Sequence, residues 1–206
     1  MRPNERSINN YIDGEGLMEN IAEKKKAILE STLELIKENG FHGTPMSMVA
    51  KKAGVAAGTI YHYFDSKDTL IYELHSYVIN TMLKAIIVGD DPQKPFEARF
   101  INLWYNNYNY YLHHPDVFQF LEQYANSPYQ THHFNESQCV TNTLRKIIGE
   151  GITQGVLKPI PERLIGELIH SSVAAVARLT VSKRLDVTNQ VLQQAVQVIW
   201  DGLKSK

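Results

Sequence analysis

The chain has 206 residues, with 21 basic and 22 acidic side chains and a formal net charge of −1. This length allows either one domain or a small domain joined to a larger one, and the balanced charge excludes a global electrostatic attraction to a polyanionic partner. The single cysteine, Cys139, excludes an internal disulfide framework and is expected to be a packed thiol.

The first 22 residues are rich in charged side chains and contain no apolar run that resembles a signal peptide, so we expect residues 1–22 to form a mobile arm. The most apolar segment, residues 171–179, is shorter than the roughly 18 residues that a membrane-spanning helix needs. It follows His170 and is interrupted by Arg178. We therefore expect a soluble, cytoplasmic protein with no membrane partner.

Two helices are predicted at the start of the folded chain. Apolar residues at helical spacing begin near Glu23 and stop at Gly40, which stands where a C-terminal glycine is common. Thr44 supplies an N-cap hydroxyl for the second helix, and Pro45 occupies its first turn. This helix ends at Gly54 after about two turns.

A third short helix is predicted over residues 57–64, after a tight glycine turn. Ile60 and Phe64 lie one turn apart and therefore share a face, which we expect to pack against the core. Ser66 caps the following helix, which should run to about residue 88. Residues 23–70 are thus predicted to form a three-helix head.

The clearest break in the chain is the stretch 89–95, which has two prolines, two aspartates and a glycine. Beyond this break we predict helices over 96–114, 115–124, from 128 onward, 162–185 and 188–203. No segment shows the alternation of a strand, so the fold class is all-α. The organisation expected is an arm, residues 1–22, a head, residues 23–70, and a larger helical body, residues 71–206.

Two short helices joined by a glycine turn are what a helix-turn-helix needs to place one helix in the major groove of DNA. With Ile60 and Phe64 inward, the third helix turns Gly58, Thr59, Tyr61 and His62 outward. Their small, hydroxyl and aromatic side chains could contact base edges or phosphates. For Tyr63, packing within the head is as good an interpretation as DNA contact.

The run GFHGTPMSMVAKKAGVAAGTIYHYFDSKDTL, Gly40 to Leu70, resembles the DNA-binding signature of the TetR family of bacterial regulators. The resemblance covers about the first third of the chain. It implies an all-α homodimer whose heads bind a palindromic operator and whose bodies bind a small molecule that releases the DNA. The residues that it nominates as DNA-facing are Thr44, Ser47, Ala57, Gly58, Thr59, Tyr61, His62, Tyr63 and Lys67.

Two departures from the family pattern weaken the charge of this head. Members often carry a hydroxyl residue and a lysine where this chain has Ala56 and Ala57. Between Glu23 and Asp68 there are seven lysines and six carboxylates, which leaves a net charge of +1. We therefore expect weak binding by a single head, a requirement for dimerisation, and a shallow dependence of affinity on salt.

Aromatic residues are concentrated in the first part of the body. They form either plain core or the lining of a pocket, and their hydroxyl and indole groups, which need partners when buried, favour a pocket for a small, mostly apolar or aromatic effector. The candidate ligand-binding residues are Trp104, Tyr108, Tyr111, Phe118, Tyr124 and His170. No cofactor is expected.

The paired histidines 113–114 and 132–133 are poor metal candidates, because adjacent residues on a helix point about 100° apart. The last two helices each carry more than one apolar face, which predicts a homodimer built through them; a buried hairpin in a monomer is the alternative. Two other function classes stay open. One is an enzyme that uses the aromatic cavity with His170 or His114 as a base, and the other is a dimeric adaptor without DNA binding.

Overall fold

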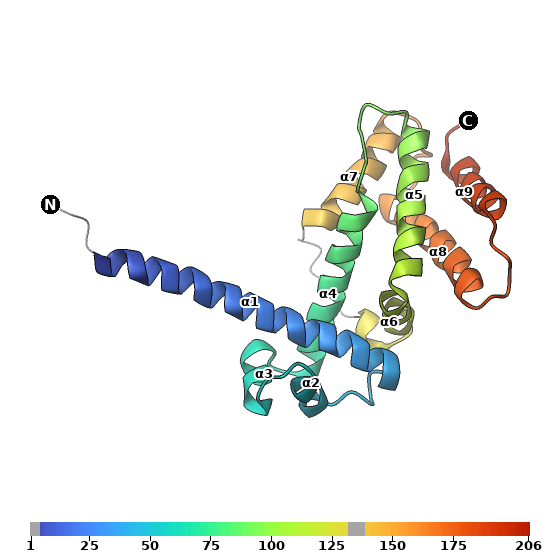
Figure 1. Cartoon of the computed structure of the whole chain (residues 1–206). Coiled ribbons are helices and arrows are strands. Elements are labelled where there is room, and N and C mark those ends of the chain that lie inside the picture. The colour runs from blue at the N-terminus through green and yellow to red at the C-terminus, as the bar shows by residue number, and fades with distance from the viewer. Residues whose placement is uncertain (1–4, 132–138) are drawn as a thin grey trace. The chain divides into compact units, whose positions relative to one another are not determined.

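A computed structural model describes residues 5–131 and 139–206, and the side chains of residues 22–130 and 143–206. Within these ranges the regular elements are helices, and an isolated bridge joins Leu157 to Lys204, so the predicted all-α fold class is confirmed. The chain divides into two compact units (Figure 1). The first comprises Met1–Tyr77 and Gln119–His132, and the second Val78–Phe118 and His133–Lys206.

The first unit is built around the predicted three-helix head. Its elements are α1 (Glu5–Asn39), α2 (Met46–Lys52), α3 (Ala57–Tyr63), the first part of α4 (Lys67–Ile86), the last part of α6 (Pro115–Ala125) and the 3₁₀ helix η1 (Pro128–Thr131). Ile28, Ile36, Ile60 and Phe64 are buried in its core, as their helical spacing predicts. The division between the units falls within α4, between Tyr77 and Val78.

Helix α1 begins at Glu5 and not at Glu23, so residues 5–22 continue the first helix of the head. Gly14 and Gly16 disfavour a helix, and the segment shows no sustained apolar period, which is why the sequence pattern predicts a separate arm. After Pro3, however, no proline interrupts the backbone.

His75 of α4 lies inside the first unit, where its ring stacks on Tyr124 with 4.0 Å between the ring centroids. Burial disfavours the charged imidazolium and lowers the pKa of His75 to about 4 from 6.5. The unfolded chain therefore binds a proton between pH 6.5 and 4 that the folded chain does not bind. The free energy of unfolding should be at its full value above pH 6.5 and fall as the pH drops toward 4.

We expect this loss to reach about 3 kcal/mol at pH 4, since one pKa unit corresponds to about 1.4 kcal/mol. Urea titrations of the full chain at several pH values between 7 and 4 would measure it. The matched variant is His75→Phe, which keeps a ring beside Tyr124 and removes the titrating group, and its stability should fall less steeply. Equal pH profiles for the two proteins would contradict the assignment to His75.

The second unit contains the end of α4 and four further helices that pack on one another. They are α5 (Phe96–His113), α7 (Cys139–Thr153), α8 (Glu162–Val181) and α9 (Asn189–Leu203). Helix α8 contacts α5, α7 and α9, and α5 also contacts α9. Thr188 caps α9 by accepting a hydrogen bond from the Val191 amide. The sequence predicts a single helix from residue 128 onward, but the structure has two elements there. Residues 128–131 form the 3₁₀ helix η1, and α7 starts at Cys139.

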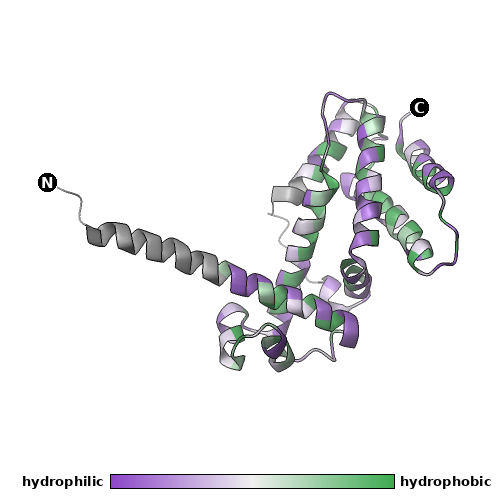
Figure 2. Cartoon of the chain, viewed as in Figure 1, coloured by the Kyte–Doolittle hydropathy of each residue, from purple (hydrophilic) through white to green (hydrophobic). Residues whose placement is uncertain are grey.

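By length and composition alone, helix α8 is long and apolar enough to cross a membrane. The sequence prediction concerned only its most apolar part, residues 171–179, which is too short to do so. Figure 2 shows hydrophobic residues along much of this helix. Helices in the interior of water-soluble proteins meet the same criterion, and α8 packs on three other helices of its unit. Some of its apolar side chains nevertheless face outward, among them Leu164, Leu168 and Leu179.

A buried arginine ties three parts of the second unit together. Arg99 of α5 is only 5% exposed and donates through Nε and Nη2 to the two carboxylate oxygens of Asp90, at 2.8 and 2.9 Å. Its Nη1 donates to Glu150 of α7 at 3.3 Å. Because the fork of the guanidinium matches the carboxylate, this arrangement fixes the turn before α5 and holds α7 against it.

Candidate nucleic-acid interface and ligand cavity

Helices α2 and α3 are joined by the tight turn that the sequence predicts. Gly54 has φ +68°, a conformation that favours glycine, and the Val55 amide donates to the Ala50 carbonyl at 3.0 Å. Ile60 of α3 is completely buried, so one face of this short helix is fixed against the unit's core. The opposite face is therefore presented to solvent.

The outward orientation predicted for Gly58, Tyr61 and His62 of α3 is confirmed by their exposure. Ala57, Gly58, Tyr61 and His62 are exposed, and Tyr61 is 55% exposed although its ring is large and mostly apolar. Thr59 and Tyr63 are half-buried. No side-chain hydrogen bond caps the helix at Ala56, in agreement with the missing hydroxyl.

Gly58 lies in open space, because a Cβ placed there would meet no atom of the described part of the protein within 4 Å. Packing within the first unit therefore does not require glycine at this position. A glycine in the exposed face of a recognition helix would instead allow a partner to approach the backbone closely. This is the arrangement expected where a helix enters a groove of DNA.

Three further residues were predicted to face DNA, namely Thr44, Ser47 and Lys67, and their environments in the structure differ. Ser47 is exposed in the first turn of α2. Thr44 is only 2% exposed and donates its hydroxyl to the Gly40 carbonyl at 2.9 Å, while the N-cap position of α2 is occupied by Pro45. The predicted capping role of Thr44 is therefore wrong, and its side chain lies apart from the exposed surface. Lys67 is half-buried and its ammonium donates to the Phe41 carbonyl.

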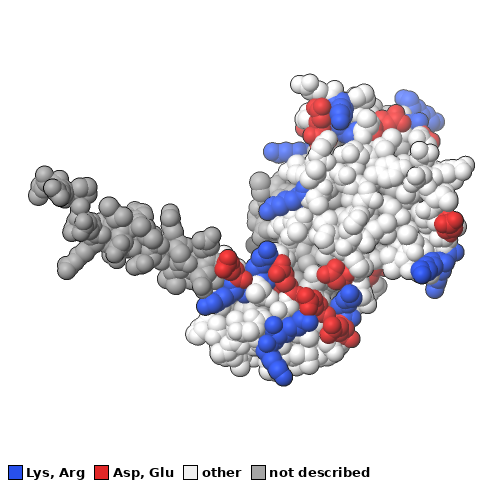
Figure 3. All heavy atoms as spheres, in the orientation of Figure 1, with Lys and Arg blue, Asp and Glu red and all other residues white. Residues whose placement is uncertain are grey.

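Acidic and basic side chains lie next to one another over the first unit (Figure 3). Lys52 and Glu34 form an ion pair of 2.6 Å, and the Glu34 carboxylate raises the pKa of Lys52. Lys25 is paired with Glu73. Helix α3 itself carries no lysine or arginine. The surface thus offers hydroxyl, aromatic and backbone groups more than positive charge.

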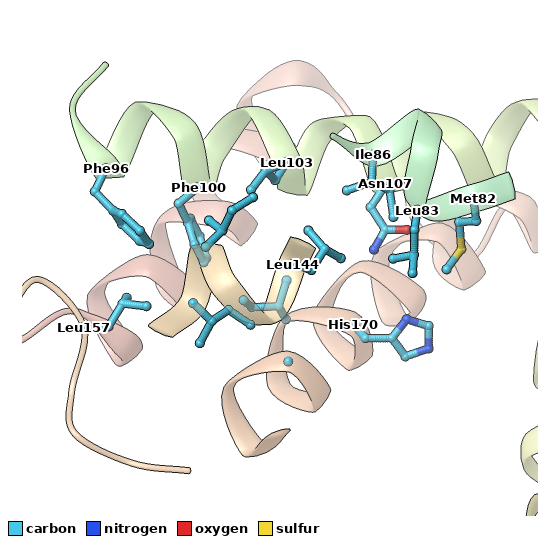
Figure 4. A pocket seen from close by; sticks show the side chains of 14 residues that line it. Met82, Leu83, Ile86, Phe96, Phe100, Leu103, Asn107, Leu144, Leu157 and His170 are labelled. Atoms are coloured by element: carbon cyan, nitrogen blue, oxygen red, sulfur yellow. The ribbon is translucent and has the colours of Figure 1, made fainter. Parts of the chain in front are cut away.

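The second unit contains an apolar cavity of about 150 Å³ (Figure 4). It is lined by α4, α5, α7 and α8 and by Leu157, which follows α7. The residues around it are Met82, Leu83, Ile86, Phe96, Phe100, Leu103, Asn107, Leu144, Ile147, Ile148, Leu157, Gly166, Ile169 and His170. Of the residues predicted to bind a ligand, His170 is part of this lining.

The other predicted ligand residues of α5 are buried core residues that do not line this cavity. The Trp104 indole donates to Ser172 Oγ at 2.9 Å, and the Tyr108 hydroxyl pairs with Thr180 Oγ1 at 3.0 Å. These buried polar groups therefore have partners, and the partners are hydroxyls of α8. The Tyr111 hydroxyl pairs with His170 Nδ1 at 3.2 Å and so reaches the cavity through that histidine.

Phe118 packs on Tyr111, with 4.8 Å between the ring centroids. Tyr124 belongs to the first unit, where its hydroxyl donates to the Tyr129 carbonyl at 3.2 Å. Neither residue is part of the cavity lining. The sequence missed the aliphatic lining of α4 and α7, because its spacing is the same as that of ordinary core.

Among the residues with described side chains, no cluster of three or more histidine, cysteine or carboxylate side chains is arranged to hold a metal ion. His113 Nδ1 lies 2.7 Å from the Asn109 carbonyl of its own helix. The pair His132–His133 and the side chain of Cys139 lie outside the described residues.

Two family models match the chain. Residues 28–74 match the model described as bacterial regulatory proteins, tetR family. Residues 95–204, which are more than half of the chain, match the model described as tetracyclin repressor-like, C-terminal domain.

Relatives agree with these matches. An uncharacterized HTH-type transcriptional regulator of Haemophilus influenzae is 32% identical over 101 residues, which cover 49% of this chain and 54% of that protein. A fatty acid metabolism regulator protein of Bacillus subtilis is 45% identical over 51 residues, 25% of this chain and 26% of that protein. The matched region thus spans about half or less of these two curated relatives.

A solved TetR family transcription regulator from Marinobacter aquaeolei has a similar fold, with a TM-score of 0.80 and 22% identity. The similarity covers 92% of this chain and 100% of that one.

Proposed function

The chain belongs to the TetR family of bacterial regulatory proteins, and from this premise we propose that it represses transcription from a palindromic operator until a small, mostly apolar effector releases it. Helix-turn-helix DNA binding and transcription regulation follow from the family itself. Because the family consists of regulators, the enzyme alternative is set aside. Repression, release by an effector and a palindromic operator do not follow from the family alone, and we propose them for this chain.

The observation that supports DNA reading is the exposed outer face of α3, with Gly58 in open space. In our proposal this face enters the major groove, and α2 braces it against the backbone of the duplex. The proposed contacts come from Ser47, Ala57, Gly58, Thr59, Tyr61, His62, Tyr63 and Lys67. Thr44 is not among the proposed DNA contacts, because its buried hydroxyl donates to the Gly40 carbonyl in the turn before α2.

We propose that two chains pair through α8 and α9. Leu164, Leu168 and Leu179 are large, exposed and spaced so that they follow one side of α8, and Val198 is exposed on α9. A two-fold axis would place the same surface of both copies in contact and would bury these side chains. A regulator that binds a palindrome needs such a pair, because each head reads one half-site.

The effector is proposed to occupy the apolar cavity of the second unit. Its binding would favour a conformation in which the two heads no longer match half-sites about one turn of DNA apart. Helix α4 belongs to both units and is the proposed route between them. The regulator would act in the bacterial cytoplasm, where operator DNA is found.

Selection of the full chain on random DNA duplexes tests the function. We expect enrichment of a palindrome, and we expect Gly58→Ala to bind the selected duplex at least about tenfold more weakly, because a methyl group intrudes where the helix backbone meets DNA. The variant should unfold no more easily than the parent, since its Cβ meets no described atom within 4 Å and alanine favours a helix.

Asn109→Ala is the control, because this exposed residue of α5 lies outside α3 and outside the proposed α8–α9 pairing surface. Its operator affinity should equal that of the parent chain. Selection that enriches no sequence would favour the adaptor alternative. Full operator affinity in the Gly58→Ala protein would remove α3 from the proposed interface.

A further inference from the structure

We propose that the outer face of α3 reads its operator through the 5-methyl groups of thymines, which it contacts with apolar groups, and not through paired hydrogen bonds to purines. This inference rests on the proposed function in taking that face as the surface that enters the major groove. It adds the chemical class of base that the surface selects.

Residues 40–74 lack the side chains that read purines best with two hydrogen bonds. Guanine is recognised in this way by arginine or lysine, and adenine by asparagine or glutamine. The stretch that contains α2, α3 and the start of α4 has no arginine, asparagine or glutamine, and none of its three lysines lies on α3. Reading of the sequence by α3 must therefore use other groups of the bases.

The three lysines of this stretch are placed for other contacts. Lys52 is paired with Glu34 at 2.6 Å, and Lys67 donates to the Phe41 carbonyl. Lys51 is exposed in the last turn of α2. A lysine ammonium is a point charge that suits a phosphate, and phosphate contacts fix the register of a protein on DNA without reading its sequence.

An apolar surface lies at the start of α3, the part of a recognition helix that contacts base edges. Ala57 is the first residue of the helix and is exposed, and Tyr61, one turn later, is 55% exposed. Residues at this spacing lie on the same side of a helix. Gly58, beside them, adds no side chain that would hold the backbone away from the bases. The Ala57 methyl group and the Tyr61 ring are thus both free to meet the bases.

Thymine is the base that offers this surface a matching group. Its 5-methyl group projects into the major groove, where alanine and aromatic side chains can contact it. Burial of one methyl group should raise affinity about fourfold. Each thymine position occurs twice in a palindromic operator, so the pair of methyl groups should contribute about 16-fold.

The polar groups of the same face discriminate less between bases. His62 is exposed and Thr59 is half-buried. A hydroxyl or a neutral imidazole donates one hydrogen bond, and N7 of either purine can accept it. These side chains therefore add affinity but do not by themselves distinguish adenine from guanine.

Base analogues in the selected operator test the inference. Deoxyuridine pairs with adenine as thymidine does and lacks only the 5-methyl group. With the full chain and the duplex enriched by selection, replacing a contacted thymine in both half-sites should weaken binding about 16-fold. Replacing guanine by 7-deazaguanine, which removes the N7 acceptor, should weaken binding less than this.

Variants of α3 then assign the methyl contacts to residues. Ala57→Gly should bind the thymine and uracil duplexes equally at one position of the half-site, and Tyr61→Ala should do so at a second position. Tyr61→Phe keeps the ring and should retain the parent's preference for thymine. Asn109→Ala, in an exposed residue of α5, should retain it at every position. A variant that is only less stable would lose affinity for both duplexes equally, so the ratio of the two affinities would not change.

Three results would overturn the inference and leave the proposed function standing. The first is a selected palindrome whose half-sites lack thymine or bind equally well with uracil. The second is a larger loss with 7-deazaguanine than with uracil, and the third is an unchanged preference for thymine in both Ala57→Gly and Tyr61→Ala. Selection that enriches no sequence would instead overturn the proposed function, and this inference with it.

Discussion

The Leu168→Glu protein is expected to be a monomer that binds its operator at least about 100-fold more weakly than the parent chain. Leu168 is 43% exposed on the outer side of α8, within the surface that we propose to pair with a second copy. In a symmetric dimer the substitution would place two carboxylates close to one another in an apolar contact. Each chain alone should keep its fold, because the side chain is not part of the core.

The size of the expected effect comes from the link between the heads. When two heads are joined, the second binds its half-site as an intramolecular event, which raises affinity by roughly 10²–10⁴-fold. A single head of this chain has little charge to compensate for the loss, since α3 carries no lysine or arginine and Lys52 is paired with Glu34. Sedimentation and operator binding would be measured on the same samples.

Val88→Glu is the matched control for this variant. Val88 is 67% exposed at the turn after α4, away from α8 and α9 in the sequence, and receives the same new charge. It should remain a dimer with unchanged operator affinity. A dimeric Leu168→Glu protein would exclude this surface as the interface, and a monomer with full affinity would exclude the requirement for two linked heads.

Arg99→Met is expected to lower the free energy of unfolding of the second unit by about 3 to 5 kcal/mol. The methionine keeps an unbranched apolar chain in place but removes all three of the hydrogen bonds that Arg99 donates to Asp90 and Glu150. The Asp90 side chain, 12% exposed, would then be a largely buried carboxylate without its cation. Breaking a buried ion pair by removing one partner is far more damaging than removing both.

Amide hydrogen exchange of α5 and α7 would measure this change within the second unit. Lys204→Met removes a matched but exposed ion pair with Asp201 and should change exchange little. The double variant Arg99→Met with Asp90→Asn should recover part of the loss, because no buried charge is left unpaired. Unchanged exchange in Arg99→Met would show that the arginine contributes nothing net to the fold.

Most helices of this protein could be predicted from local patterns. Gly40 adopts φ +67° after α1, and Ser66 and Thr188 accept hydrogen bonds at the starts of α4 and α9, as their residue types suggest. The start of α1 could not be predicted, since Gly14 and Gly16 argue locally against a helix that nevertheless continues. Thr44 has the residue type of an N-cap, but its hydroxyl donates to Gly40 instead.

The exposed face of α3 could be predicted because the period of a helix fixes which residues lie opposite Ile60. The cavity could not, because its position depends on contacts between residues far apart in the chain. Ser172 and Thr180 of α8 satisfy Trp104 and Tyr108, which removes the reason to place those aromatics beside a ligand. Asn107 gives no local sign that its oxygen is buried without a donor.

The chain has two tryptophans, Trp104 and Trp200, and both are buried in the second unit. Trp200 packs on Phe100 of the cavity wall, with 5.2 Å between the ring centroids. Indole fluorescence of the unmodified protein therefore reports on the second unit alone, since the first contains only tyrosine and phenylalanine as emitting groups. The protein thus carries an intrinsic optical probe for effector binding and for melting of the second unit, without any attached dye.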